Sequence, residues 1–156
     1  MKLQHSVRYD APPGEVYAML TDPAFREKAS WAQGAESVDV TISGTTVAIE
    51  MVQPTRDIPA FARTFAGDTV RAVQAEEWDD DRAAAFSVSS PGKPAGVHGT
   101  RRLVADGAGT LDTFEGEARA RIPLIGGRIE GLLGTRLKDG WDIEHGVGVA
   151  WLEGER

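Results

Sequence analysis

Apolar and polar side chains alternate along residues 2–9. Because successive side chains of a strand point to opposite faces of a sheet, this alternation predicts a half-buried strand. Its inner side would carry Leu3, His5, Val7 and Tyr9. Helical patterns follow at 11–20, where two prolines suit a first helical turn, and at 21–30, where Asp22 suits the N-cap. We therefore expect one strand followed by two short helices.

Six further strands are predicted from period-two alternation and from the turn residues between the apolar runs. They cover residues 38–42, 47–52, 68–78, 83–90, 97–107 and 110–122. Residues 53–67 interrupt this series with two prolines and a closing glycine, and we expect an apolar loop or a short helix there. Because short turns join the strands, an antiparallel meander is expected, and a sheet of this size curls under its own twist.

The last predicted strand shows the clearest alternation. Its inner face would carry Asp112, Phe114, Gly116, Ala118, Ala120 and Ile122. Apolar residues at helical spacing then predict one helix over residues 126–152, roughly 40 Å long at about 1.5 Å per residue. Glycine inside a helix costs about 1 kcal/mol against alanine, yet Gly127, Gly131 and Gly134 recur at close to one-turn spacing. We expect them to face the small residues of the strand, either in contact or across a cavity.

The composition restricts the class of protein. The 156 residues fit a single domain, 1–156, and the formal net charge is -7 with a pI of about 4.9. An acidic surface argues against nucleic acid as a partner and against adhesion to anionic lipid. The chain has no cysteine, no apolar signal core in residues 1–10 and no run near the roughly 20 apolar residues of a spanning helix. We expect a cytoplasmic domain without stable membrane insertion, monomeric or weakly dimeric.

No motif in the sequence specifies a reaction. The three histidines His5, His98 and His145 lack metal-ligand spacing, so no metal is expected, and His5 is expected to be a hydrogen-bonded core residue. The glycine run at 126–134 matches neither a phosphate-binding loop nor a dinucleotide fingerprint, and no nucleophile elbow is present. Neither a cofactor nor a catalytic residue is identified.

Ionisable residues on inward positions are the remaining candidates for pocket chemistry. Asp112 shares the inner face of the last strand, Glu130 opens the long helix, and either Arg101 or Arg102 must face inward. A buried arginine paired with a carboxylate would be a ligand anchor or a structural ion pair. We favour the structural pair, because such pairs are common whereas reactive dyads are rare.

The order strand, two short helices, six strands and a long helix resembles the START-like (SRPBCC) superfamily, which has the helix-grip fold. The motifs "APPGEVYAMLTDPAF" and "IPLIGGRIEGLL" carry the resemblance, which covers nearly the whole chain and is strongest to a bacterial subfamily described only as a domain of unknown function. It implies an α+β fold in which a curved antiparallel sheet of about seven strands is crossed on its concave face by the C-terminal helix, with an apolar cavity between them.

Three functions are therefore considered. The first is a carrier of a small hydrophobic or amphipathic ligand, the second is a polyketide cyclase/aromatase-like enzyme, and the third is a protein-interaction domain with a filled core. Candidate cavity residues are His5, Tyr9, Met51, Phe61, Phe65, Trp78, Phe86, Arg101, Asp112, Phe114, Gly131 and Trp141. Ile58, Phe61 and Phe65 are expected either to form a flap over one end of the cavity or to plug it as ordinary core.

Overall fold

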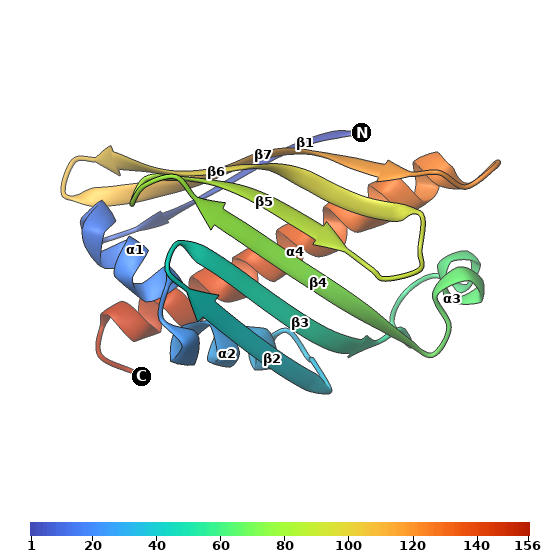
Figure 1. Ribbon diagram of the computed structural model, residues 1–156, viewed down its shortest axis with the longest axis horizontal. Coiled ribbons are helices and arrows are strands. Elements are labelled where there is room, and N and C mark those ends of the chain that lie inside the picture. The colour runs from blue at the N-terminus through green and yellow to red at the C-terminus, as the bar shows by residue number, and fades with distance from the viewer.

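The computed structural model describes residues 1–156 and contains one seven-stranded antiparallel sheet (Figure 1). Its strands are β1 (Lys2–Tyr9), β2 (Ser37–Ser43), β3 (Thr46–Pro54), β4 (Thr69–Trp78), β5 (Ala83–Ser89), β6 (Ala95–Asp106) and β7 (Gly109–Ala120). The order across the sheet is β1-β7-β6-β5-β4-β3-β2. The chain therefore runs as a meander from β2 to β7, and β1 is added at the β7 edge.

Four helices accompany this sheet: α1 (Pro13–Leu20), α2 (Pro23–Ala32), α3 (Ala60–Ala66) and α4 (Gly126–Leu152). The long helix α4 runs diagonally along one face of the sheet (Figure 1). Helices α1 and α2 lie near its C-terminal end, whereas α3 lies near the opposite end. This is the helix-grip arrangement that the sequence predicts. No helix combines the length and the apolar composition needed to cross a membrane.

Local chemistry accounts for where these elements begin and end. The side chain of Asp22 accepts a hydrogen bond of 2.9 Å from the backbone N–H of Ala24 and so caps α2. Gly67, with a φ of 85°, ends α3, which makes the short helix the correct alternative for this segment. The last strand ends at Ala120 rather than at Ile122, because its ladder partner β6 begins opposite it.

The predicted alternation of β7 is confirmed. Phe114 and Ala118 are buried towards α4, whereas Glu115 and Arg119 are exposed on the other face. Gly116 is directly paired with a second glycine of β6. A Cβ atom at Gly116 would lie 2.7 Å from the carbonyl oxygen of the facing strand, so only glycine permits the close approach of β6 and β7 here.

The glycines of α4 behave differently from the expectation. A Cβ atom at Gly134 would lie 2.9 Å from a methyl group of Met1, and one at Gly148 would lie 2.8 Å from the ring of Tyr9. At Gly127 and Gly131 it would meet nothing within 4 Å. Of the two alternatives expected for these glycines, direct contact with the strand is therefore not found at Gly127 and Gly131. The stripe of α4 that packs on the sheet is made by Gly134, Trp141, Glu144, Gly148 and Trp151.

The interior is divided into separate apolar clusters. The largest contains fourteen buried residues, among them Tyr9, Trp78 and Trp151, and lies where α1 and α2 meet the C-terminal part of α4. Clusters of six and three residues lie along the N-terminal part of α4. Between the large cluster and the two small ones, the inner positions of several elements carry charged side chains, which are described below.

Candidate ligand-binding cavity

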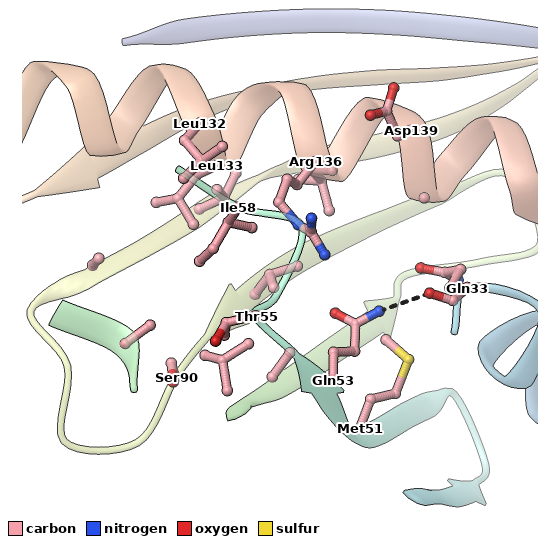
Figure 2. Close-up of a pocket in the computed structure, with 18 of the residues that line it drawn as sticks. Gln33, Met51, Gln53, Thr55, Ile58, Ser90, Leu132, Leu133, Arg136 and Asp139 are labelled. Atoms are coloured by element: carbon pink, nitrogen blue, oxygen red, sulfur yellow. Dashed lines mark hydrogen bonds between the residues drawn. The ribbon is translucent and has the colours of Figure 1, made fainter. Parts of the chain in front are cut away.

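A cavity of about 370 Å³ lies between the sheet and the N-terminal part of α4 (Figure 2). Thirty residues line it, and sixteen of them are hydrophobic. Its apolar wall includes Val70, Ala72, Val88 and Val97 from the strands and Ile129, Leu133, Leu137 and Trp141 from α4. The volume falls within the range of about 300–1,000 Å³ that is typical of small-molecule sites.

The mouth of the cavity is formed by the segment between β3 and β4 together with the loop before β6. Ile58 and Phe65 point their apolar side chains to the cavity, and the ammonium group of Lys93 donates a hydrogen bond of 3.0 Å to the carbonyl oxygen of Phe65. The guanidinium of Arg136 on α4 lies 3.3 Å from the carboxylate of Asp57. Both partners of this ion pair are exposed, so it contributes at most about 1 kcal/mol.

Behind the floor of the cavity lies a buried cluster of charges centred on Arg101, and Glu144 is the member of this cluster that reaches the cavity. The guanidinium of Arg101 donates two hydrogen bonds to Asp112, of 3.0 and 2.7 Å, one of 3.0 Å to Glu76 and one of 2.6 Å to Glu144. Arg101, Asp112 and Glu76 are fully buried. The expected ion pair between an inward arginine and a carboxylate is thus present, between Arg101 and Asp112, as part of a larger network.

A second buried arginine completes this cluster. Arg26 on α2 contacts Glu76, lies 3.2 Å from Glu144 and donates a hydrogen bond of 2.6 Å to the carbonyl oxygen of Leu20. Residues Arg26, Glu76, Arg101, Asp112 and Glu144, called the ionic layer below, come from five different elements. The layer holds three carboxylates and two guanidiniums, which leaves one negative charge in excess when all five groups are ionised.

The ionic layer lies between the cavity and most of the large apolar cluster, although Met51 belongs to that cluster and also lines the cavity. Along β4, Gln74 lines the cavity, Glu76 belongs to the layer and Trp78 lies in the cluster. The same succession occurs along α4, where Trp141 lines the cavity, Glu144 belongs to the layer and Trp151 lies in the cluster. Glu144 is the one member of the layer that also lines the cavity.

Burial and ion pairing oppose each other in this layer. Burial raises the pKa of Glu76, but Arg26 and Arg101 outweigh it and hold the pKa at about 2. Burial raises the pKa of Asp112 above its ordinary value, because Arg101 is its only partner. Burial also raises the pKa of Tyr9, whose hydroxyl has no hydrogen-bond partner. Burial therefore favours the protonated form of Asp112, whereas ion pairing favours the charged form of Glu76.

Three of the twelve candidate residues line the cavity: Met51, Phe65 and Trp141. Arg101 and Asp112 lie behind the floor, in the ionic layer, while Tyr9 and Trp78 belong to the large apolar cluster on its far side. These four side chains face the interior as expected, but the layer separates them from the space in which a ligand fits.

The other five candidates support the wall or lie outside it. Phe86 and Phe114 pack against Trp141, with the ring of Phe114 stacked 3.8 Å away, so they back the wall. His5 lies at the β1 edge, where its Nε2 atom is 2.7 Å from Asp142. Phe61 packs against the guanidinium of Arg128, and Gly131 faces open space.

Sequence reasoning missed the polar lining of the cavity. Gln33, Gln53, Gln74 and Glu144 all line it. Gln74 was detectable, because it shares the inner side of β4 with the cavity-lining Ala72 in the alternating pattern. Glu130, considered as a pocket acid, instead accepts a hydrogen bond of 3.0 Å from the backbone N–H of Ala120, which lowers the pKa of Glu130.

The chemistry available in the cavity is limited. No cluster of three or more His, Asp or Glu side chains is arranged to hold a metal ion. Of the acidic side chains that line the cavity, Glu144 is buried, and both of its oxygens contact guanidiniums. The cavity therefore combines an apolar wall with a polar floor, at which Glu144 is held by hydrogen bonds from Arg26 and Arg101.

The curved sheet, the gripping helix and the cavity between them make up the helix-grip fold. Residues 4–152 match the family model described as "Protein of unknown function (DUF2505)". The chain therefore belongs to the DUF2505 family. A comparison with curated protein sequences gives no match.

Solved structures with the same fold include proteins of different kinds. TTHA0849 from Thermus thermophilus has a TM-score of 0.69 at 20% identity, with 99% of each chain covered. Norcoclaurine synthase from Thalictrum flavum, solved in complex with dopamine and hydroxybenzaldehyde, has a TM-score of 0.68 at 12% identity, over 100% of this chain and 88% of that one. The Zhui aromatase/cyclase from Streptomyces sp. R1128 has a TM-score of 0.66 at 14% identity, over 98% and 93%. At these identities the likeness establishes the fold alone.

Proposed function

We propose that this protein is a binding or carrier domain for a small hydrophobic or amphipathic molecule held between the sheet and α4. The observation that carries the proposal is the cavity of about 370 Å³, whose lining is more than half hydrophobic and whose floor is polar. An apolar molecule gains roughly 25 cal/mol for each Å² removed from water, so such a wall favours an apolar body. The acidic, cysteine-free composition supports a cytoplasmic location, as a single domain that is monomeric or weakly dimeric.

The cavity weighs against the third function considered, a protein-interaction domain with a filled core. It also gives the segment between β3 and β4 a role in the proposal. Ile58 and Phe65 line the mouth from this segment, which supports the proposal that the segment is a flap over a bound molecule. The exposed ion pair between Arg136 and Asp57 joins the segment to α4 at little energetic cost to opening.

The proposal is tested by titration with the fluorescent apolar probe N-phenylnaphthylamine, whose emission rises on transfer from water to an apolar site. We expect saturable binding at one site per chain. Ala72 is half-buried on the cavity wall, and Ala72→Trp should fill part of the space and weaken binding by about tenfold or more.

The matched control is Ala85→Trp, which makes the same change at an exposed position of the neighbouring strand β5. It should leave probe affinity unchanged. Equal affinity of the wild type and both variants would contradict binding in the cavity, and the absence of any saturable binding would contradict the proposal as a whole. Circular dichroism of each variant shows whether the fold is retained.

The second candidate is an enzyme of the cyclase/aromatase type, and the position of Glu144 favours it. This residue is buried, contacts the cavity and is held by Arg26 and Arg101. The two guanidiniums fix its orientation, and its carboxyl group would serve as the general base that accepts a proton from a bound substrate.

This role predicts that the protein catalyses exchange of the acidic C–H proton of a bound aromatic diketone with solvent deuterium. Exchange is followed by proton NMR, with phenylbutanedione as the probe. Glu144→Gln should abolish the catalysed exchange and retain binding of the probe. Exchange at the rate of buffer alone, with the diketone bound by the wild type, would exclude the enzymatic role for Glu144.

A further inference from the structure

The polar lining of the cavity has a common hydrogen-bonding character. Three glutamines, Gln33, Gln53 and Gln74, line it from α2's C-terminal side, from β3 and from β4. Each uses its amide nitrogen in a hydrogen bond within the protein. Gln33 donates to the carbonyl oxygen of Ala29 at 3.3 Å, and Gln53 donates to the carbonyl oxygen of Gln33 at 3.3 Å (dashed in Figure 2).

Gln74 completes the set by donating to the Glu76 carboxylate at 3.1 Å. These partners fix which way each amide points. Backbone carbonyl and carboxylate oxygens only accept hydrogen bonds, so the NH₂ end of each glutamine must face its partner. The carbonyl end of each amide is then left without a donor. Tyr9 supplies the only buried side-chain polar atom without a partner, so the three amide oxygens are not sealed inside protein.

The charged side chains behind the floor also favour a hydrogen-bond donor on the ligand, as these amide oxygens do. Glu144 reaches the cavity from a layer with three carboxylates and two guanidiniums. Each carboxylate oxygen has capacity for more than one hydrogen bond, so contacts with Arg26 and Arg101 do not exhaust Glu144 as an acceptor. A donor bound at the floor would therefore find unpaired acceptors in the three amide oxygens and further acceptor capacity in Glu144. A cationic donor would also lie beside the layer, which carries one negative charge in excess when all five groups are ionised.

We propose that this acceptor-lined wall, made by Gln33, Gln53, Gln74 and Glu144, selects ligands that carry a hydrogen-bond donor, and above all an ammonium group, on an apolar body. The inference rests on the proposed binding function and names the ligand class for the same cavity. A ligand whose polar end only accepts hydrogen bonds would leave these oxygens desolvated and unpaired, which opposes its binding.

The cations of the cavity lie at its mouth and already have partners. Lys93 donates to the carbonyl oxygen of Phe65, and Arg136 pairs with Asp57. They are the groups to which a carboxylate ligand would bind instead. A carboxylate probe therefore belongs in the test, since tight binding of an anion would place the polar end of the ligand at the mouth rather than at the acceptor wall.

The test compares five probes that share a naphthalene ring: naphthylethylamine, naphthylethanol, the methyl ether of that alcohol, naphthylacetate and ethylnaphthalene. Binding to the wild-type protein is measured by isothermal titration calorimetry near neutral pH. We expect the amine to bind most tightly and the alcohol to bind about three- to tenfold more tightly than its ether, which has lost the donor. The amine should bind about tenfold or more tightly than naphthylacetate.

A variant then assigns the preference to the wall. Gln53 is half-buried at the end of β3, and Gln53→Lys replaces an acceptor by a cationic donor. It should weaken the amine and strengthen naphthylacetate, each by about tenfold. The control Gln4→Lys makes the same change at an exposed position of β1, outside the cavity, and should alter neither affinity. Thermal unfolding verifies that both variants are folded. The comparison of the five probes on the wild-type protein does not depend on either variant.

The outcomes separate this inference from the function on which it rests. Equal affinity for the alcohol and the ether, or tightest binding of naphthylacetate, overturns the acceptor-wall inference and leaves the cavity as a binding site. Failure of all five probes to bind overturns the proposed binding function and the inference with it. A Gln53→Lys protein that is folded but keeps the wild-type order of affinities also overturns the role of the wall.

Discussion

Replacing Arg101 by methionine tests how much the ionic layer contributes to stability. The guanidinium of Arg101 is fully buried and binds three carboxylates. Asp112 has no other hydrogen-bond partner, so the variant leaves it buried and unpaired, while Glu76 and Glu144 each retain Arg26. Methionine fills much of the volume of the arginine stem, so the change is mainly one of charge and hydrogen bonding.

The magnitude follows from the number of groups left without partners. Removing one member of a buried ion pair costs about 3–5 kcal/mol, because the remaining charge stays buried. In a domain of this size, each kcal/mol lowers the melting temperature by about 2–4 °C, so a loss of about 6–20 °C is expected for Arg101→Met. Protonation of Asp112 limits the loss, since burial already raises its pKa.

Two further variants separate the effect of disrupting the ionic layer from the effect of removing an arginine charge elsewhere. Arg71 and Glu50 form an ion pair with side chains 59% and 43% exposed, so Arg71→Met should cost less than about 1 kcal/mol. The double variant Arg101→Met with Asp112→Leu removes the orphaned carboxylate and should recover part of the loss. Melting is followed by circular dichroism at neutral pH, with urea unfolding to give the free energies. An Arg101→Met protein no less stable than Arg71→Met, or a double variant no better than the single one, would refute the reasoning.

Three further predictions follow from the same interior. Burial opposes ionisation of Glu76, but its guanidinium partners hold the pKa at about 2, against 4.5 for the ordinary group. The stability that the ionised Glu76 contributes is therefore complete above pH 4.5 and is lost as the pH falls towards 2. Glu76→Gln should flatten the fall in melting temperature over that pH window, and an unchanged slope would count against the pairing. Gly131→Ala should stabilise the protein by about 0.4–1 kcal/mol, because its Cβ would meet nothing within 4 Å. Gly148→Ala should cost about 1–3 kcal/mol, because its Cβ would lie 2.8 Å from the ring of Tyr9. Urea unfolding measures both changes, and equal changes in the two variants would contradict this difference. Hydrogen exchange should be faster in residues 56–66 than in the sheet and should slow when N-phenylnaphthylamine binds; protection equal to that of the strands, unaffected by the probe, would leave a plug rather than a flap.

The order of elements and the inner face of β7 could be read from the sequence, because both depend on local patterns. The alternation that places Phe114 and Ala118 inside is a period of two, and a one-residue shift would bury the charged residues between them. The capping by Asp22 and the helix of residues 126–152 likewise follow from neighbouring residues. The helix-grip fold was therefore accessible from local patterns and from the resemblance they carry.

The site depended on contacts between distant segments, which no local pattern specifies. Arg26 and Glu76 lie fifty positions apart in the sequence. They pair because α2 packs on the face of the sheet to which the side chain of Glu76 points. The rotation of α4 decided that Gly148 and Gly134 approach neighbouring side chains whereas Gly131 faces open space. Whether small residues meet or leave a cavity is set by the distance between sheet and helix. That distance results from the packing of many side chains at once, so only the tertiary structure determines it.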